Sequence, residues 1–382
     1  MTANKRIVAI DAGRGAAMLF VFLSHFAEVY FHNNHQQVIL EKCWHIGMVA
    51  SPTFMLISGI VLGYLYCINK DNFKRIKLKL IDRGLFLLTI GHVFILFAHV
   101  PMTHGIRNAL HWTFITDAIA LSIITGPLII SYLSKAKRLL LGLSIYIVCL
   151  LVIYFWRPVS TMILNILEEE LIGTLHKFFF VDNFSILIWF SVYLCGSVIG
   201  EIIGELHLEQ RDYKIKIFLS QLGILLIASA IGIKFIYHFL LSTGVKENFF
   251  FLSNFFQKNP PGPTYLFFYG GIGLLILTFL FWLEEKKWFG HLLNILSNIG
   301  KASLIIFIIQ YYVYFSVFEI LHLAFTKLWL IYFILSVVFI ILCGNYWLKK
   351  NYNKYFTIIN LGKELKELIK NTFKIWKRIS TV

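Results

Sequence analysis

The chain has 382 residues, of which 58% are hydrophobic and only 14% are charged, and 37 of them are phenylalanine. A soluble domain cannot hide that much apolar surface in one core, so the composition excludes an ordinary soluble protein and predicts a membrane protein. The formal net charge of +15 falls in short clusters between apolar runs, which is typical of membrane topology and excludes a nucleic-acid-binding surface.

Apolar segments long enough to cross a hydrocarbon layer of about 30 Å recur along nearly the whole chain. We therefore predict an all-α, polytopic bundle of about ten transmembrane helices, with a membrane domain at 1–350 and a basic cytoplasmic tail at 351–382. The predicted helices, in chain order, cover 7–30, 44–68, 80–100, 109–133, 139–156, 184–205, 216–242, 264–284, 302–322 and 328–348.

Alternate connections between these helices are basic, and the others are rich in histidine, amide or aromatic side chains. By the positive-inside rule, the basic side is cytoplasmic and both termini lie there, which predicts a protein of the cytoplasmic (inner) membrane. The long outer segments 157–183 and 243–263 are candidate lids over an external cavity. In the tail, 361–379 has apolar residues at helical spacing between lysines, which predicts an amphipathic helix on the anionic inner leaflet; a solvated basic tail is the alternative.

The first predicted helix carries most of its ionisable groups on one face. The series Asp11, Arg14, Met18, Val21, His25, Glu28 and His32 follows three- and four-residue steps, and the eleven single-residue steps from Arg14 to His25 make about three full turns. Charged groups within a bilayer are unfavourable unless they face protein or water, so this polar stripe is a candidate functional site. The structural alternative is an ion pair between Asp11 and Arg14, with His25 satisfied by a neighbouring helix.

The two ends of the polar stripe suit different tasks. Arg14 lies near the cytoplasmic end, where a guanidinium fits the phosphates of a nucleotide-bearing donor. His25 lies about 16 Å further along the helix, where an imidazole can take a proton from an acceptor hydroxyl that attacks a thioester. Glu28 follows one turn later and can orient that imidazole. We expect Arg14 and His25 to face one shared cavity that a long, thin donor can thread.

Ser58 and a basic segment supply further candidate ligands for the donor. Ser58 belongs to a small-residue face, for which close helix packing is favoured over contact with a substrate. Arg75, Lys79 and Arg83 recur at four-residue intervals. If this segment is helical they form one positive ridge that can hold phosphates, and the alternative is a cytoplasmic anchor.

Asp117 is the remaining ionisable candidate, in the fourth predicted helix. A lone carboxylate in an apolar run fits a polar group of the cavity, and a structural hydrogen bond is an equal alternative. The five cysteines are scattered, which supports neither a disulfide framework nor a metal site.

Several motifs resemble those of membrane acyltransferases. Arg14 and His25, with ten residues between them, resemble the R-X10-H motif of the acyltransferase family 3 proteins. The wider pattern is similar to that of the heparan-alpha-glucosaminide N-acetyltransferase-like proteins, although Tyr311 stands where these often have a histidine. The segments that carry this likeness are Ile10 to Gly15, 51–59, 83–85, Asn259 to Leu266, and Asn298 to Phe307.

The resemblance implies an enzyme that takes an acetyl or other short acyl group from cytosolic acetyl-CoA, or another acyl-CoA, and transfers it to a sugar of an extracytoplasmic glycan. It also implies that Arg14 and His25 are the essential pair, with His25 as base or transient acyl carrier. A histidine of the first outer loop is implied as well, with His35 as the first candidate and His32 as the second.

Other functions and partners remain open at this point. The main alternative is a transporter or flippase for a lipid-linked sugar, whose path the same polar stripe would line. A non-catalytic scaffold would leave that stripe unexplained. The expected partners are acyl-CoA, a glycan or lipid-linked sugar, and membrane lipids, without nucleic acid or a metal ion. The small-residue faces also allow a homo-oligomer, because they serve packing within and between chains.

Overall fold

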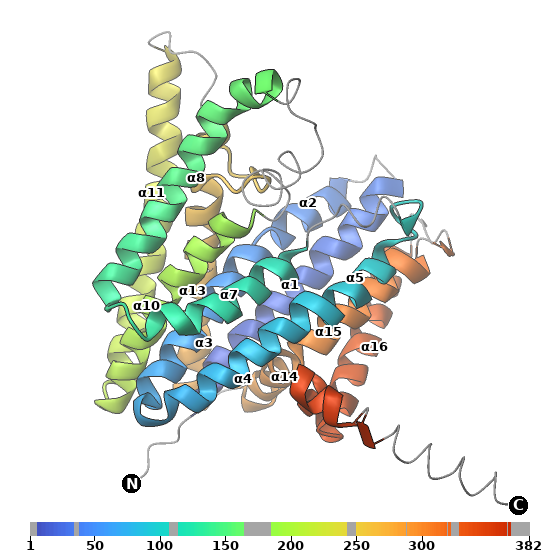
Figure 1. Cartoon of the computed structure of the whole chain (residues 1–382). Helices are drawn as coiled ribbons and strands as arrows, with labels where there is room; N and C mark the ends of the chain where they lie inside the picture. Colours follow the sequence, from blue (N-terminus) through green and yellow to red (C-terminus); the bar gives the residue numbers. More distant parts are fainter. Residues whose placement is uncertain are drawn as a thin grey trace, which may run out of the picture.

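The computed structural model describes most of the chain, namely residues 6–33, 38–106, 114–163, 185–242, 250–287, 289–318, 320–321, 328–364 and 366–367. This part of the chain is helical and contains no β-strand (Figure 1). The helices of its first half are α1 (Val8–Asn33), α2 (Val38–Gly47), α3 (Ala50–Ile68), α4 (Phe73–Phe86), α5 (His92–His99), α7 (Ile115–Ile130) and α8 (Lys135–Ile163). Those of the second half are α10 (Ile186–Leu208), α11 (Asp212–Ser242), α12 (Phe250–Ser253), α13 (Pro263–Lys286), α14 (Gly290–Lys301), α15 (Ser303–Tyr311) and α16 (Trp329–Lys349).

Several shorter turns join these helices. The π-helical turns η2 (Leu87–Gly91) and η5 (Tyr312–Phe318) continue α4 and α15, and the 3-10 turns η1 (Lys70–Asn72) and η6 (Tyr352–Tyr355) precede α4 and follow α16. Within the described ranges, eight helical stretches are long and apolar enough to cross a membrane, and α14 with α15–η5 forms a bent ninth. The predicted all-α membrane bundle is confirmed, and each of its ten predicted segments contains a helix.

Two elements differ from the prediction. The helix expected at 302–322 is the second arm of a broken span, because α14 precedes it and the two arms are bent by 72°. The prediction missed α14 because His291, Asn294 and Asn298 make it too polar for a membrane-crossing segment. The basic connection at 70–79 is helical from Phe73 onward, so the conditional ridge of basic residues does form on α4.

α1 lies inside the bundle and packs against α14, α2, α3 and α13. Its closest approach is to α14, where a Cβ atom at Gly15 would overlap the carbonyl oxygen of Leu296, and one at Gly300 would overlap that of Asp11. Glycine at both positions lets the two backbones touch. This contact holds Arg14 against the beginning of α15.

Two ionic contacts join α8 to α10, and one of them is buried. Arg138 donates to the Glu201 carboxylate and, over 3.1 Å, to the Ser197 hydroxyl, and its side chain is only 1% exposed. One turn away, the Lys135 ammonium lies 2.6 Å from Glu205. Arg138 therefore points into the bundle, where the Glu201 carboxylate and the Ser197 hydroxyl bind it. It is not one of the exposed basic residues that mark the side of the membrane.

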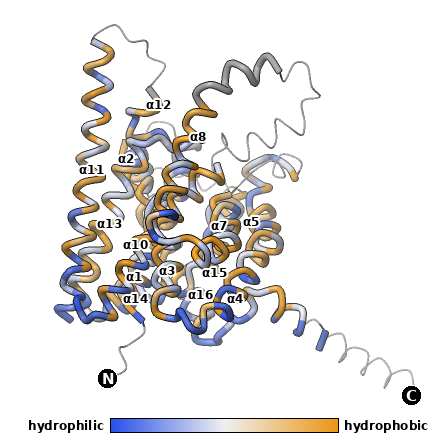
Figure 2. The backbone as a smooth tube through the Cα atoms, turned by 60° about the vertical axis from the view of Figure 1, so that its left-hand side comes forward, coloured by the Kyte–Doolittle hydropathy of each residue, from blue (hydrophilic) through white to orange (hydrophobic). Residues whose placement is uncertain are grey.

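The beginning of α1 and the end of α16 lie at the same end of the bundle (Figure 1). Hydrophilic residues gather at this end, for example where α4 and α11 begin (Figure 2). The outer face of α11 carries exposed apolar side chains such as Phe235 and Phe239, which suit contact with lipid. That both termini are cytoplasmic stays a prediction.

The segment after α16 folds back onto α4. The Asp82 carboxylate accepts hydrogen bonds from the backbone N–H groups of Ile358 and Ile359, at 3.0 and 3.3 Å, where the chain becomes helical again. Phe356 packs between the rings of Phe86 and Trp347. Most of the amphipathic helix predicted at 361–379 lies outside the described residues, so this helix stays a prediction.

Candidate active site

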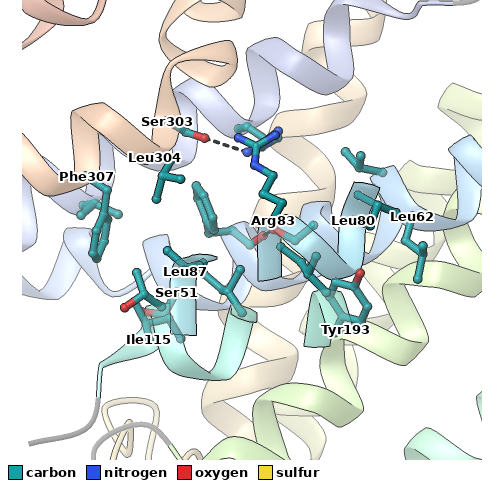
Figure 3. A pocket seen from close by; sticks show the side chains of 18 of the residues that line it. Ser51, Leu62, Leu80, Arg83, Leu87, Ile115, Tyr193, Ser303, Leu304 and Phe307 are labelled. Carbon is teal, nitrogen blue, oxygen red and sulfur yellow. Dashed lines mark hydrogen bonds between the residues drawn. The ribbon is translucent and has the colours of Figure 1, made fainter. Parts of the chain in front are cut away.

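Two cavities open along the polar stripe of α1, one at Arg14 and one at His25. The Arg14 cavity has a volume of about 180 Å³ and is mostly apolar. Its polar lining comes from Arg14, Ser51, Ser58, Arg83, Thr116, Tyr193 and Ser303. Figure 3 shows it with Ser303 and Phe307 of α15 on one side and Leu62 and Tyr193 on the other.

Arg14 is held from several sides at the edge of its cavity. One terminal nitrogen, Nη2, donates a hydrogen bond of 2.7 Å to the Ser303 hydroxyl, and the guanidinium carbon lies 5.8 Å from the centre of the Phe54 ring. Its Nε atom is buried and has no hydrogen-bond partner among the described residues. Asp11 pairs instead with Arg6, at 2.7 Å, and does not line the cavity. The i,i+3 ion pair between Asp11 and Arg14 is thus not the arrangement found.

Arg83 brings a second guanidinium into the same cavity. It comes from the basic ridge on α4, whose other two members, Arg75 and Lys79, are exposed and do not line the cavity. The positive charges of Arg83 and Arg14 repel each other, and no residue that lines this cavity in the described part of the chain is acidic. Two cations in apolar surroundings favour an anionic ligand, and guanidinium groups match phosphate geometry.

The His25 cavity has a volume of about 270 Å³ and a different chemistry. It combines imidazole, carboxylate, ammonium and amide groups with aromatic rings. The lining residues are His25, Glu28, Trp44, His99, Phe114, Phe256, Gln257, Lys258, Asn259, Tyr311 and Phe315. Hydroxyl-rich molecules fit such a lining, because polar groups bond their hydroxyls and rings cover their apolar faces.

His25 itself lies among aromatic rings. The centres of the Tyr311 and Phe315 rings are each 5.1 Å from the centre of the imidazole, and that of Phe307 is 6.1 Å away, all in edge-on arrangements. The Nδ1 atom is buried without a hydrogen-bond partner among the described residues. The Gln310 side chain faces the imidazole and is fully buried, and its two amide atoms have no hydrogen-bond partner among the described residues.

A thin wall of side chains separates the two cavities. Phe307 lines the Arg14 cavity and touches His25 from that side. At the beginning of α7, Phe114 lines the His25 cavity, whereas the next residue, Ile115, lines the Arg14 cavity. The expected single cavity is therefore divided in this structure, because apolar side chains of α7 and α15 meet between its two ends.

The remaining predicted site residues are placed as follows. Glu28 lines the His25 cavity and Ser58 the Arg14 cavity. Asp117 is buried outside both linings; its carboxylate accepts a bond from the Phe114 N–H at 2.9 Å and lies 2.8 Å from His92 Nδ1, which is the structural alternative considered above. His35 lies outside the described residues, as does the side chain of His32.

Several polar residues near His25 were not among the predicted site residues, for example His99, Lys258 and Gln310. His99 is the last residue of α5. Lys258 directly precedes the segment from Asn259 to Leu266, one of those that carry the resemblance to membrane acyltransferases. Gln310 gives no signal beyond being the one amide in an apolar run. The described residues contain no group of three or more side chains suited to hold a metal ion.

A family model described as an acyltransferase domain, that of acyltransferase family 3, matches residues 7–345, which is most of the chain. The chain belongs to acyltransferase family 3. No curated protein and no solved structure shows significant similarity to it. The match runs from α1 to the main part of α16. The helices that line the two cavities therefore all belong to the acyltransferase domain.

Proposed function

We propose that this acyltransferase moves an acetyl or other short acyl group from acyl-CoA, on the cytoplasmic side, to a sugar hydroxyl of an extracytoplasmic glycan. One observation carries the proposal: Arg14 and His25 lie on one face of α1, and each opens onto its own cavity, the first cationic and the second polar and aromatic. A donor with a phosphate-bearing end and a distant thioester needs two such sites in series.

In this proposal the Arg14 cavity holds the phosphates of coenzyme A. Arg14 and Arg83 neutralise them, and Ser58 and Ser303 supply hydroxyls on the same lining. Arg75 and Lys79, exposed on α4, attract the anionic donor from solution. Asp11 acts only indirectly, by fixing Arg6 beside the entrance of the polar stripe.

The reaction itself takes place beside His25. The acceptor oxygen attacks the thioester carbonyl, so that a new C–O bond forms, the C–S bond breaks, and His25 takes the hydroxyl proton and returns it to the departing thiolate. In a two-step variant the imidazole first carries the acyl group. Glu28, one turn from His25, stabilises the imidazolium, and His35 remains a predicted contributor. Phe307 has to turn aside for the thioester to reach the imidazole.

The experiment measures donor binding and transfer separately in Arg14→Ala and His25→Ala. Arg14→Ala should weaken the binding of labelled coenzyme A to the purified protein by roughly 30-fold or more, because removing one partner of a desolvated charged contact costs about 2–5 kcal/mol. His25→Ala should still bind coenzyme A but release thiol from acetyl-CoA, in membranes that contain acceptors, roughly 10²- to 10⁴-fold more slowly.

Arg211→Ala and His238→Ala are the matched controls, since both residues are exposed and neither lines a cavity. They should behave like the unmodified protein. Full acyl transfer by both Arg14→Ala and His25→Ala would rule the proposal out. The absence of coenzyme A binding and of thiol release from the unmodified protein would instead favour transport of a lipid-linked sugar.

A further inference from the structure

A tight loop between α12 and α13 projects three polar side chains into the His25 cavity: Gln257, Lys258 and Asn259. Hydrogen bonds hold the loop in shape, from the Gly262 N–H to the Gln257 carbonyl at 2.9 Å and from Gln257 Nε2 to the Asn259 carbonyl at 2.7 Å. Tyr146 of α8 donates to the Pro261 carbonyl over 3.4 Å. Contacts within the protein therefore hold the backbone on both sides of Lys258.

Lys258 carries a positive charge into the cavity that holds the proposed base. Its ammonium attracts the Glu28 carboxylate and acts on the His25 imidazole as well. Burial lowers the pKa of Lys258, and the nearby carboxylate of Glu28 partly offsets this. Lys258 and Glu28 thus form a preorganised pair of opposite charges beside His25.

Acyl transfer to a hydroxyl creates one negative and one positive charge, to which the opposite charges of Lys258 and Glu28 correspond. When the acceptor oxygen attacks the thioester, the carbonyl oxygen becomes negative, and the base that takes the proton becomes positive. A carboxylate one helical turn from His25 is suited to the positive imidazolium. The Lys258 ammonium on the loop carries the charge opposite to that of the developing oxyanion, and a donor fixed before reaction stabilises that charge without reorganisation.

We propose that Lys258 is a catalytic residue whose ammonium donates a hydrogen bond to the oxyanion formed at the thioester carbonyl. This inference rests on the proposed function. As the tetrahedral intermediate collapses, the oxyanion reforms the carbonyl, the C–S bond breaks, and the thiolate takes the proton from His25. Lys258 keeps its own proton throughout, so it acts only in its charged form.

Three variants test this role in membranes that contain acceptors, with thiol release from acetyl-CoA as the readout. Lys258→Met should lower the rate at saturating acetyl-CoA by roughly 10²- to 10³-fold, the usual effect of removing one oxyanion donor, without changing the KM for acetyl-CoA. Lys258→Arg should keep most of the activity. The control Lys137→Met, at an exposed site on α8, should be unchanged.

The pH profile distinguishes this role from a structural one. Because Lys258 must be charged, activity should fall as the pH rises through its lowered pKa, and Lys258→Arg should move this alkaline limb to higher pH. The other titratable groups that line the same cavity are His25, Glu28, His99 and Tyr311. These four residues are unchanged in Lys258→Arg. If one of them caused the loss of activity at high pH, that loss would occur at the same pH in the variant.

Each outcome bears on one of the two proposals. If the unmodified protein releases thiol and His25→Ala does not, a Lys258→Met variant with the unmodified rate overturns the inference alone. If Lys258→Met does not fold, as shown by lost coenzyme A binding, an unmoved alkaline limb in Lys258→Arg overturns it as well. If His25→Ala is fully active, the proposed function itself fails.

Discussion

Two polar side chains, His25 and Gln310, face each other in an otherwise aromatic part of the membrane domain. The buried Nδ1 of His25 and both amide atoms of Gln310 lack hydrogen-bond partners among the described residues. A buried polar group without a partner destabilises a fold, so its presence beside the proposed base favours a functional reason. We expect Gln310 to orient the imidazole once substrate closes the cavity.

Gln310→Met tests this at the level of one side chain. Methionine has a similar length and no polar group that needs a partner, so the variant should unfold at a higher temperature, with a gain of about 1–3 kcal/mol in the free energy of unfolding. The rate of acyl transfer should fall at the same time, because the imidazole loses its neighbour. Unfolding experiments in detergent and thiol-release assays give the two quantities. Lower stability together with unchanged activity would contradict the functional role.

The three basic residues on one face of α4 have different surroundings. Arg75, Lys79 and Arg83 are spaced by four residues, yet the first two are exposed and only Arg83 lines the Arg14 cavity. The helix enters the bundle as it proceeds, so the same face meets water first and protein later. Regular spacing therefore predicted the shared face, but not which member of the ridge reaches the cavity.

Glycine residues of α3 bring it close to α10. Ser58, also on α3, lines the Arg14 cavity. A Cβ atom at Gly63 would overlap the Ser197 carbonyl oxygen, so the small-residue face serves close helix packing as favoured from the sequence.

Gly63→Ala should therefore lower the free energy of unfolding by about 1–3 kcal/mol, the usual effect of overpacking. Gly232→Ala on α11 is the control. A Cβ atom there meets nothing within 4 Å, and alanine favours helix over glycine, so this variant should be neutral or slightly stabilising. Thermal unfolding of both variants in the same detergent measures the difference, and equal midpoints would mean that the α3–α10 contact tolerates a methyl group.

At the scale of the whole molecule, the polar stripe of α1 joins two cavities of different chemistry. Arg14 lies nearer the end of the bundle where α4 and α11 begin, and hydrophilic residues gather at that end (Figure 2). Under the proposed function, a charged donor and a glycan acceptor would enter from opposite ends and meet near His25. Phe307 lines the Arg14 cavity and contacts His25, so it lies between the two cavities.

This arrangement predicts sidedness in sealed vesicles. Acetyl-CoA does not cross a bilayer, so it should support acyl transfer only in vesicles that expose the face where α1 begins and α16 ends. Vesicles of the opposite orientation should become active only after detergent opens them. Thiol release from both preparations, before and after detergent, measures the effect. Equal rates in both intact preparations would contradict the assignment of the donor to the end of the bundle at Arg14.

Composition and local spacing were sufficient for the class of fold and for the polar stripe. Apolar length predicts helices because backbone groups in lipid must bond within their own segment, and the angle of about 100° per residue brings Arg14 and His25 to one face whatever the neighbours are. α14 escaped prediction because this short arm of a broken span is amphipathic, so it has neither the length nor the composition of a membrane-crossing helix.

Contacts between distant segments required the folded chain. Lys258 and Gln310 reach His25 from loops and helices more than two hundred residues away, and Phe307 with Ile115 divides the expected cavity in two. Periodicity describes which residues share a face of one helix, but it carries no information about which face of another helix will meet it. That depends on where glycines such as Gly15 and Gly300 allow two backbones to touch, a property of pairs of helices and not of either one alone.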